Sequence, residues 1–250
     1  MKVIKYILLL LISLNFLSPL KAQLDTLNKK RLTTVIASEA TIYSGTMVGL
    51  SQLWYKDVPT TSFHTFNDNQ EWLQMDKIGH SVTSYYVGMA GYEVLKWSGV
   101  SEKKATWYGG TLGLFLLTSV EVLDGYSVDW GFSTGDMVAN VSGTGLFIAQ
   151  QLAWKEQRVL LKYSFHTTDY ASIRPNVLGS NLTEQVLKDY NGQTYWLSAN
   201  IASFLKDDAK FPKWLNLAVG YGAEGILGGH DNVFETDGVY YDYSDTERTR

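Results

Sequence analysis

The chain has 250 residues and a formal net charge of −4, with 18% charged and 14% aromatic residues. It contains no cysteine, which excludes a disulfide framework, a thiol nucleophile, thiolate metal ligation and a lipid-modified cysteine. The acidic balance argues against a nucleic-acid partner, because a basic patch is the usual footprint of such binding. The eight Trp and sixteen Tyr are typical of a protein that contacts a membrane interface. We therefore expect a membrane or another envelope component as partner, while the oligomeric state stays open.

The first 22 residues predict a secretory signal peptide. Lys2 and Lys5 precede an apolar run from Ile7 to Leu17, and the helix-breaking Pro19 follows. The run has about eleven residues, fewer than the roughly twenty that a membrane span needs. Cleavage after Ala22 is expected, and an uncleaved anchor is the alternative. The sequence thus predicts a protein that is exported from the cytoplasm.

Residues 23–155 are predicted to form a helical domain, a membrane-associated four-helix bundle. The expected helices cover residues 33–55, 71–97, 101–123 and 133–154, with a loop at 59–70 and a turn at 125–131. Small residues recur along them at spacings that let helix backbones approach closely, namely Gly45 and Gly49, Gly88 and Gly91, and Gly109 and Gly113. Ionisable residues also lie inside these segments, and they are costly in lipid. A bundle resting against a membrane, or partly embedded with its polar groups inward, accommodates both features.

Residues 156–250 are predicted to be rich in β-strands, so the fold class is α+β. Apolar and polar residues alternate over 159–165, 195–201 and 215–221, and more weakly over 239–243. This pattern is typical of antiparallel strands with one apolar face. The chain stops at DTERTR without a terminal strand, which suggests that the given sequence lacks its natural end.

Three successive helical segments each carry a polar pair among apolar neighbours. Asp76 and His80 are four residues apart, as are Asp136 and Asn140, and Asp124 follows Glu121 by three. These spacings place both members of a pair on one helix face. If the helices pack together, the three pairs converge. Further polar candidates lie beside them, namely Lys77, Ser127 and Ser133.

Such a cluster supports two kinds of chemistry. In the first, His80 is a general base that Asp76 orients and stabilises. In the second, a divalent cation is bound by carboxylates, with one imidazole nitrogen. For that cation the sequence offers Glu121, Asp124 and Asp136, and the remaining residues of a binding site would be Lys77, Ser127, Ser133 and Asn140.

A purely structural network is the competing interpretation. Ser133 and Asp136 match a capping box in which Ser133 caps the fourth helix and Asp136 reaches back. Asp76 could bond His80 within its own helix, and the other carboxylates could satisfy nearby donors. The three remaining histidines lack a carboxylate framework in the sequence, namely His64, His166 and His230.

The motifs DKxxH, ExxDGxS and SxxDxxANxxG occur in this order at Asp76–His80, Glu121–Ser127 and Ser133–Gly143. Over roughly residues 70–150 the chain resembles the YfiM-like family of predicted periplasmic proteins of unknown function. More distantly it is similar to the VanZ-like membrane proteins. The segment KDYNGQTYWLS at 188–198 resembles an extension of envelope homologues from Bacteroidetes-type bacteria. Together with the export signal, the resemblance implies a membrane-associated protein of the periplasm or outer membrane of a Gram-negative bacterium, and it implies no settled reaction.

Two functional hypotheses follow. The first is a non-enzymatic, membrane-associated structural or interaction module whose polar cluster organises the bundle. The second is a membrane-proximal hydrolase or transferase acting on lipid or cell-wall material, with a site built on histidine and carboxylates. The mutual geometry of the cluster separates them.

Overall fold

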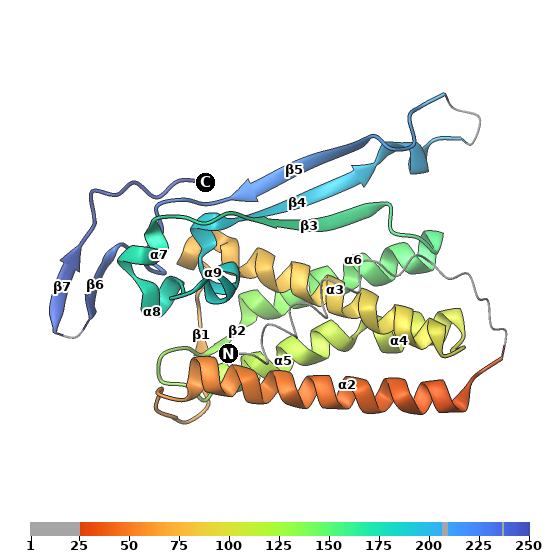
Figure 1. Ribbon diagram of the computed structural model, residues 1–250, viewed down its shortest axis with the longest axis horizontal. Helices are drawn as coiled ribbons and strands as arrows, with labels where there is room; N and C mark the ends of the chain where they lie inside the picture. Colours follow the sequence, from red (N-terminus) through yellow and green to blue (C-terminus); the bar gives the residue numbers. More distant parts are fainter. Residues whose placement is uncertain (1–25, 207–209, 237) are drawn as a thin grey trace.

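The protein is described by a computed structural model that covers residues 26–206, 210–236 and 238–250. The predicted signal peptide, residues 1–22, lies outside the described residues. The fold is a mixed α+β arrangement, as the sequence predicts. Five helices run along the long axis of the molecule, and a three-stranded sheet lies on the side opposite α2 (Figure 1).

The helical region contains α2 (Lys29–Leu50), which continues as a π-helix (Ser51–Tyr55), then a 3-10 turn (Glu71–Gln74) and α3 (Met75–Trp97). The helices α4 (Glu102–Gly110), α5 (Leu112–Asp124) and α6 (Thr134–Trp154) follow. The predictions for 33–55, 71–97 and 133–154 are confirmed to within a few residues. Among the described residues, no helix combines the length and the apolar character needed to cross a membrane.

The single helix predicted over 101–123 is wrong. The chain forms two helices, α4 and α5, which part at Thr111. Gly109 and Gly110 end α4, and glycine is a poor helix former because it loses the most backbone freedom. The break lets the α4–α5 junction follow the surface of α3. With this break and a loosely packed α2, the predicted four-helix bundle is not confirmed.

Glycines bring α3 close to three of its neighbours. A Cβ added at Gly91 would meet the backbone of Gly109, and one at Gly113 would meet the backbone of Ser84. On α6, a Cβ at Gly143 would overlap the carbonyl oxygen of Ser81. Only a residue without a side chain fits at such positions.

The small residues of α2 have a different environment. A Cβ built at Gly45 or Gly49 meets no described atom within 4 Å, so these two glycines make no close helix contact. Only Val35 of α2 is buried. The outer side of α2 therefore remains open to solvent.

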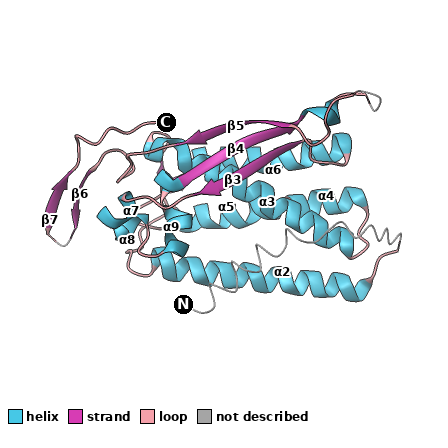
Figure 2. Ribbon diagram, turned by 45° about the horizontal axis from the view of Figure 1, so that its top comes forward, coloured by secondary structure: helices cyan, strands magenta, loops and turns pink. Residues whose placement is uncertain are grey.

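The sheet has the order β3-β4-β5, with antiparallel strands β3 (Val159–Phe165), β4 (Gln193–Asn200) and β5 (Asn216–Gly222). Three of the four predicted strand segments match these strands. The register aligns Leu161 with Leu197, and Leu197 with Val219. Leu161 packs against the cluster that contains Tyr85 and Phe147, so the β3 side of the sheet covers α3 and α6 (Figure 2).

Several short elements were not predicted. Between β3 and β4 lie α7 (Tyr170–Ile173), α8 (Pro175–Leu178), α9 (Leu182–Lys188) and a 3-10 turn (Tyr190–Gly192), and a second 3-10 turn (Ile201–Phe204) follows β4. The weak pattern at 239–243 belongs to β7 (Val239–Asp242), which pairs with β6 (Val233–Thr236) in a hairpin. In the helical region β1 (Thr65–Phe66) and β2 (Phe132–Ser133) form a short parallel pair.

Candidate cation site

The β1–β2 pair positions the start of α6. Phe66 pairs with Ser133, so the loop before α3 is fixed beside the first turn of α6. The Ser133 hydroxyl accepts a hydrogen bond from the backbone N–H of Asp136 at 3.0 Å and thereby caps α6. The same hydroxyl donates to Oδ1 of Asp68 at 2.6 Å. This local geometry places the Asp136 side chain between α6 and α3.

One half of the predicted capping box is wrong. The cap by Ser133 is present, but the Asp136 side chain does not reach back to the Ser133 backbone. Oε2 of Glu121 accepts from the Ser133 N–H at 3.0 Å instead. The Asp136 carboxylate is thereby free to contact α3.

Lys77 lies buried among carboxylates from three segments. Its Nζ is 2.9 Å from Oδ1 of Asp68, 3.1 Å from Oδ1 of Asp136 and 3.8 Å from Oδ2 of Asp76. These carboxylates raise the pKa of Lys77 against the opposing effect of burial. Lys77 is therefore the internal counter-ion of the cluster and remains protonated.

His80 presents its two ring nitrogens to different groups. Nδ1 lies 3.1 Å from the amide oxygen of Asn140 and 3.7 Å from Oε1 of Glu121. An amide oxygen only accepts, so this contact requires Nδ1 to carry the proton. In the neutral ring Nε2 then keeps its lone pair, and it faces Oδ1 of Asp76 at 3.8 Å. A histidine that binds a metal is typically held in this way, with one ring nitrogen fixed by an acceptor and the other directed at the ion.

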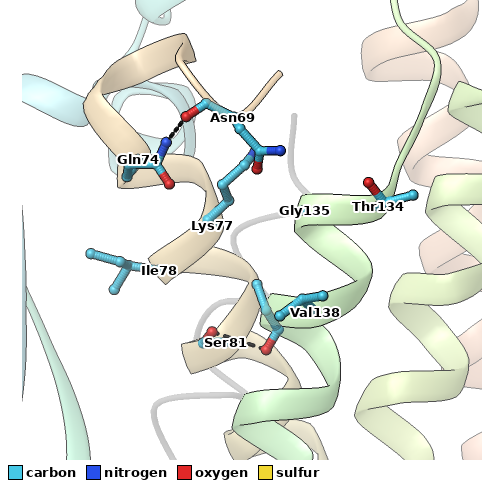
Figure 3. A pocket seen from close by; sticks show the side chains of 9 residues that line it. Asn69, Gln74, Lys77, Ile78, Ser81, Thr134, Gly135 and Val138 are labelled. Carbon is cyan, nitrogen blue, oxygen red and sulfur yellow. Dashed lines mark hydrogen bonds between the residues drawn. The ribbon is translucent and has the colours of Figure 1, made fainter. Parts of the chain in front are cut away.

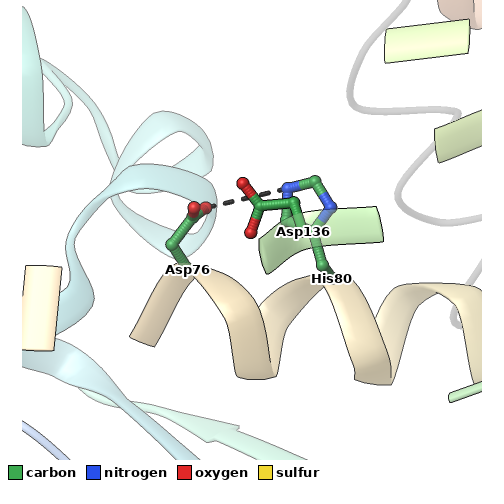
Figure 4. A group of neighbouring side chains, drawn as sticks. All are labelled: Asp76, His80 and Asp136. Carbon is green, nitrogen blue, oxygen red and sulfur yellow. Dashed lines mark ion pairs between the residues drawn. The ribbon is translucent and has the colours of Figure 1, made fainter. Parts of the chain in front are cut away.

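Asp76, His80 and Asp136 form a compact group of possible ligands (Figure 4). Each offers one ligand atom, and all of these atoms lie within 4.8 Å of one another. Ligand atoms of one first-row cation lie about 2.0–2.2 Å from the ion, so two of them are at most roughly 4.4 Å apart. A small side-chain adjustment would therefore suffice for all three to bind one ion.

The cluster holds more negative charge than its own cations balance. Burial raises the pKa of Glu121 to about 7 and that of Asp136 to about 8, in spite of His80 and Lys77 nearby. The neighbouring carboxylates raise the pKa of His80, although burial opposes them. Burial is the largest cause of the raised pKa of both acids, and the neighbouring Asp76 adds to it.

The other predicted residues lie at the border of this cluster. Burial raises the pKa of Asp124 to about 6, and its Oδ1 accepts a 2.5 Å hydrogen bond from the Tyr55 hydroxyl. Ser127 is buried, and its hydroxyl has no hydrogen-bond partner among the described residues. The structure thus brings His80, Asp76 and Asp136 together as a ligand group and leaves Asp124 and Ser127 at the edge.

Sequence reasoning missed three contributors. Asp68 lies in the loop before α3, and Tyr55 lies at the end of the π-helix. Tyr190 comes from the 3-10 turn before β4 and donates to Oδ1 of Asp76 at 3.0 Å. These residues reach the cluster only through long-range packing, and their sequence positions show no periodic relation to Asp76 or Asp136.

An open depression borders the cluster (Figure 3). It lies between α3 and α6, and its lining residues include Lys77, Ser81, Gly135 and Val138. Lys77 is shared between the depression and the buried cluster. His80 itself retains 17% side-chain exposure, so the cluster is not sealed from the outside.

Comparison with known proteins identifies one similarity. Residues 64–151 match the model of a family described as "Predicted periplasmic lipoprotein (DUF2279)". The matched range contains the three motifs on which the cluster is built, and it agrees with an exported envelope protein of unknown function. The match supports a periplasmic family of unknown function, but it does not show the YfiM-like or the VanZ-like family specifically. No curated protein and no solved structure matches the chain.

The matched range covers about a third of the chain, so the chain is similar to that family over this range. The family description mentions a lipoprotein, whereas this sequence contains no cysteine that could carry the lipid.

Proposed function

We propose that this envelope protein binds a divalent cation through Nε2 of His80 and the carboxylates of Asp76 and Asp136. The observation that carries the proposal is the orientation of His80. Its Nδ1 is engaged by Asn140 and Glu121, and its Nε2 is directed at carboxylate oxygens. A donor set of one imidazole and two carboxylates suits Mn²⁺ and Zn²⁺, because imidazole favours the later metals and carboxylate the harder ones.

A second observation supports a ligand at this place. Asn140 is completely buried, and its amide nitrogen has no hydrogen-bond partner among the described residues. A buried donor without a partner is costly. An oxygen ligand on the cation, such as a bound water, would give this N–H group an acceptor beside His80.

The cation would also balance the charge of the cluster. It would take the place of the protons that keep Asp136 and Glu121 neutral near pH 7. If the protein is a non-enzymatic, membrane-associated envelope module, the role of this ion is structural, and it organises the junction of α3, α5 and α6.

A hydrolase or transferase acting on lipid or cell-wall material is the second candidate. The open depression beside Lys77 favours it, since a substrate could approach the cluster from that side. In that case His80, Asp76 and Asp136 would hold the cation, which would supply Lewis-acid activation of a water molecule. The two candidates share the cation and differ in whether a substrate reaches it.

The test measures binding of Mn²⁺ and Zn²⁺ by titration calorimetry after chelator treatment, with elemental analysis of the purified protein. We expect one ion per chain, and a loss of affinity of at least about a hundredfold in His80→Ala and Asp136→Asn. His166→Ala is the matched control, because His166 is exposed at the end of β3 and lies outside the cluster.

Folding of each variant is checked by circular dichroism. Unchanged binding in a folded His80→Ala protein would refute the proposed ligand set. If His80→Ala unfolds even with excess metal, the folded Asp136→Asn variant decides the question in the same way.

A further inference from the structure

Basic side chains gather at one end of the molecule, although the chain as a whole is acidic. This end contains the start of α2, the end of α3, the start of α4, the end of α6 and the β4–β5 connection (right-hand side of Figure 1). We call it the basic end. Its exposed basic residues outside ion pairs, within the described part of the chain, are Lys29, Lys30, Lys103, Lys104, Lys155, Lys206, Lys210 and Lys213.

The acidic residues described at this end do not cancel that charge. Glu102 pairs with Lys96 at 2.9 Å, and Glu156 pairs with Arg158 at 2.8 Å. Glu93, near the end of α3, is exposed and has no ion pair among the described residues, and the sequence places Asp207 and Asp208 between Lys206 and Lys210. The eight lysines outnumber these three acids and leave a net positive charge, whereas the candidate cation site near the start of α3 and α6 is rich in carboxylates.

Large apolar and aromatic side chains are exposed among these lysines. The set consists of Leu27, Trp97, Trp107, Trp154, Phe204, Leu205 and Trp214. Trp214 is 78% exposed, which is an unfavourable position for an indole ring in water. Tryptophan beside lysine is the composition that proteins place at the headgroup level of a bilayer.

Packing between separate elements holds this surface together. The Arg31 guanidinium lies 4.6 Å from the ring centroid of Trp97, which joins α2 to α3. The rings of Trp154 and Phe204 meet edge to face, with centroids 5.4 Å apart, and join α6 to the turn after β4. Trp97, Trp154 and Phe204 are therefore each held by a contact between two elements.

From these observations we infer that the basic end docks onto the surface of an anionic phospholipid bilayer. Lysines supply attraction to the lipid phosphates, and the indole rings enter the interface. Charge complementarity favours an anionic bilayer as the partner, because the exposed lysines of the basic end would repel the basic end of a second copy. The inference is independent of the cation site, which uses other residues at a different place.

The test is co-sedimentation of the purified exported protein with vesicles of phosphatidylcholine that contain 0 or 30–40% phosphatidylglycerol, roughly the range in which lysine clusters respond to surface charge. We expect binding to the anionic vesicles, little binding to the neutral ones, and release at high salt. Each basic residue near an anionic surface contributes roughly fivefold to partitioning. The double variant Lys103→Glu, Lys104→Glu should therefore bind at least about tenfold more weakly.

The matched control is Lys56→Glu, Lys162→Glu, which changes the net charge equally at exposed sites away from the basic end. It should bind as the unmodified protein does. Trp214→Ser should weaken binding without removing its dependence on phosphatidylglycerol. The inference would be overturned if both double variants lost vesicle binding equally, or if the protein bound neutral and anionic vesicles equally well. It would also be overturned if the substitutions changed self-association of the protein and left lipid binding unchanged.

Discussion

At the residue scale, the cluster shows how burial and neighbours set the protonation of each group. Lys77 lies within 3.1 Å of carboxylate oxygens from two other segments, Asp68 and Asp136. Hydrogen bonds with Asp136, Ser133 and Lys77 lower the pKa of Asp68 against the opposing effect of burial, whereas burial and the neighbouring Asp76 raise the pKa of Asp136. The two aspartates on Lys77 thus have opposite shifts, because Asp136 is the more deeply buried and its hydrogen bond with Asp68 favours the proton on Asp136.

These shifts predict a pH dependence of the metal-free protein. Asp136 and Glu121 keep their protons up to about pH 8 and pH 7 in the folded state, whereas unfolded carboxyls release them near pH 4. The folded state therefore binds more protons between these limits, and the free energy of unfolding falls as the pH rises. The raised pKa of His80 acts in the same direction, since its stabilisation is lost as the pH rises through the folded value.

We expect the free energy of unfolding, measured with urea in the presence of a chelator, to decrease by a few kcal/mol, as an order of magnitude, between pH 5 and pH 8. Added Mn²⁺ should restore more stability at pH 8 than at pH 5, because it competes with fewer protons. Asp136→Asn should flatten the profile. A metal-free protein that is equally or more stable at pH 8 would contradict the assigned shifts.

At the element scale, two glycines of α6 differ in their packing: Gly143 lies against α3, whereas Gly145 has no close neighbour among the described residues. A Cβ at Gly143 would overlap the Ser81 carbonyl oxygen, whereas a Cβ at Gly145 meets no described atom within 4 Å. Both residues lie in the same helix, two positions apart. The sequence shows two glycines of equal appearance, and only the contact with α3 distinguishes them.

Gly143→Ala should destabilise the protein by about 2 kcal/mol or more, because α3 and α6 must move apart. Gly145→Ala should leave stability unchanged or raise it by up to about 1 kcal/mol, as alanine is the better helix former. Thermal and urea unfolding of the two variants provide the measurement. Equal effects would mean that α3 and α6 do not pack as described.

At the scale of the whole molecule, the β-rich region takes part in the candidate site. The Tyr190 hydroxyl donates to Asp76 at 3.0 Å, and Tyr195 packs with Met75 and Val82 of α3. The division at residue 155 remains a prediction, but the helical region does not complete the cluster alone. If Asp76 binds the proposed cation, its orientation by Tyr190 would couple cation affinity to the packing of the β-rich region on α3.

Tyr190→Phe should lower cation affinity about tenfold while the fold is retained, because Asp76 loses the donor that orients it. The matched control is Tyr163→Phe, which removes a hydroxyl bonded to the Val186 carbonyl, away from the cluster. Titration calorimetry on both variants compares them directly. Equal affinities would show that Tyr190 has no part in positioning the ligand.

The sequence by itself determined the elements and the pairs of polar residues. Periodicity of apolar residues located four helical segments and three strands of the main sheet, since burial of one face imposes that period. Spacings of three and four residues placed Asp76 with His80, and Asp136 with Asn140, on common helix faces. It did not reveal the break at Thr111, because glycines also lie inside the unbroken helix α3, and the close approach of Gly109 to α3 is visible only in the structure.

Only the tertiary structure decided which pairs meet. It brought Asp76, His80 and Asp136 together as possible ligands, bonded Asp124 to Tyr55, and added Asp68 and Tyr190 from distant segments. It also placed lysines from four separate segments at one end of the molecule. Such convergence depends on helix–helix contacts and on the placement of loops, and local sequence patterns carry no information about either.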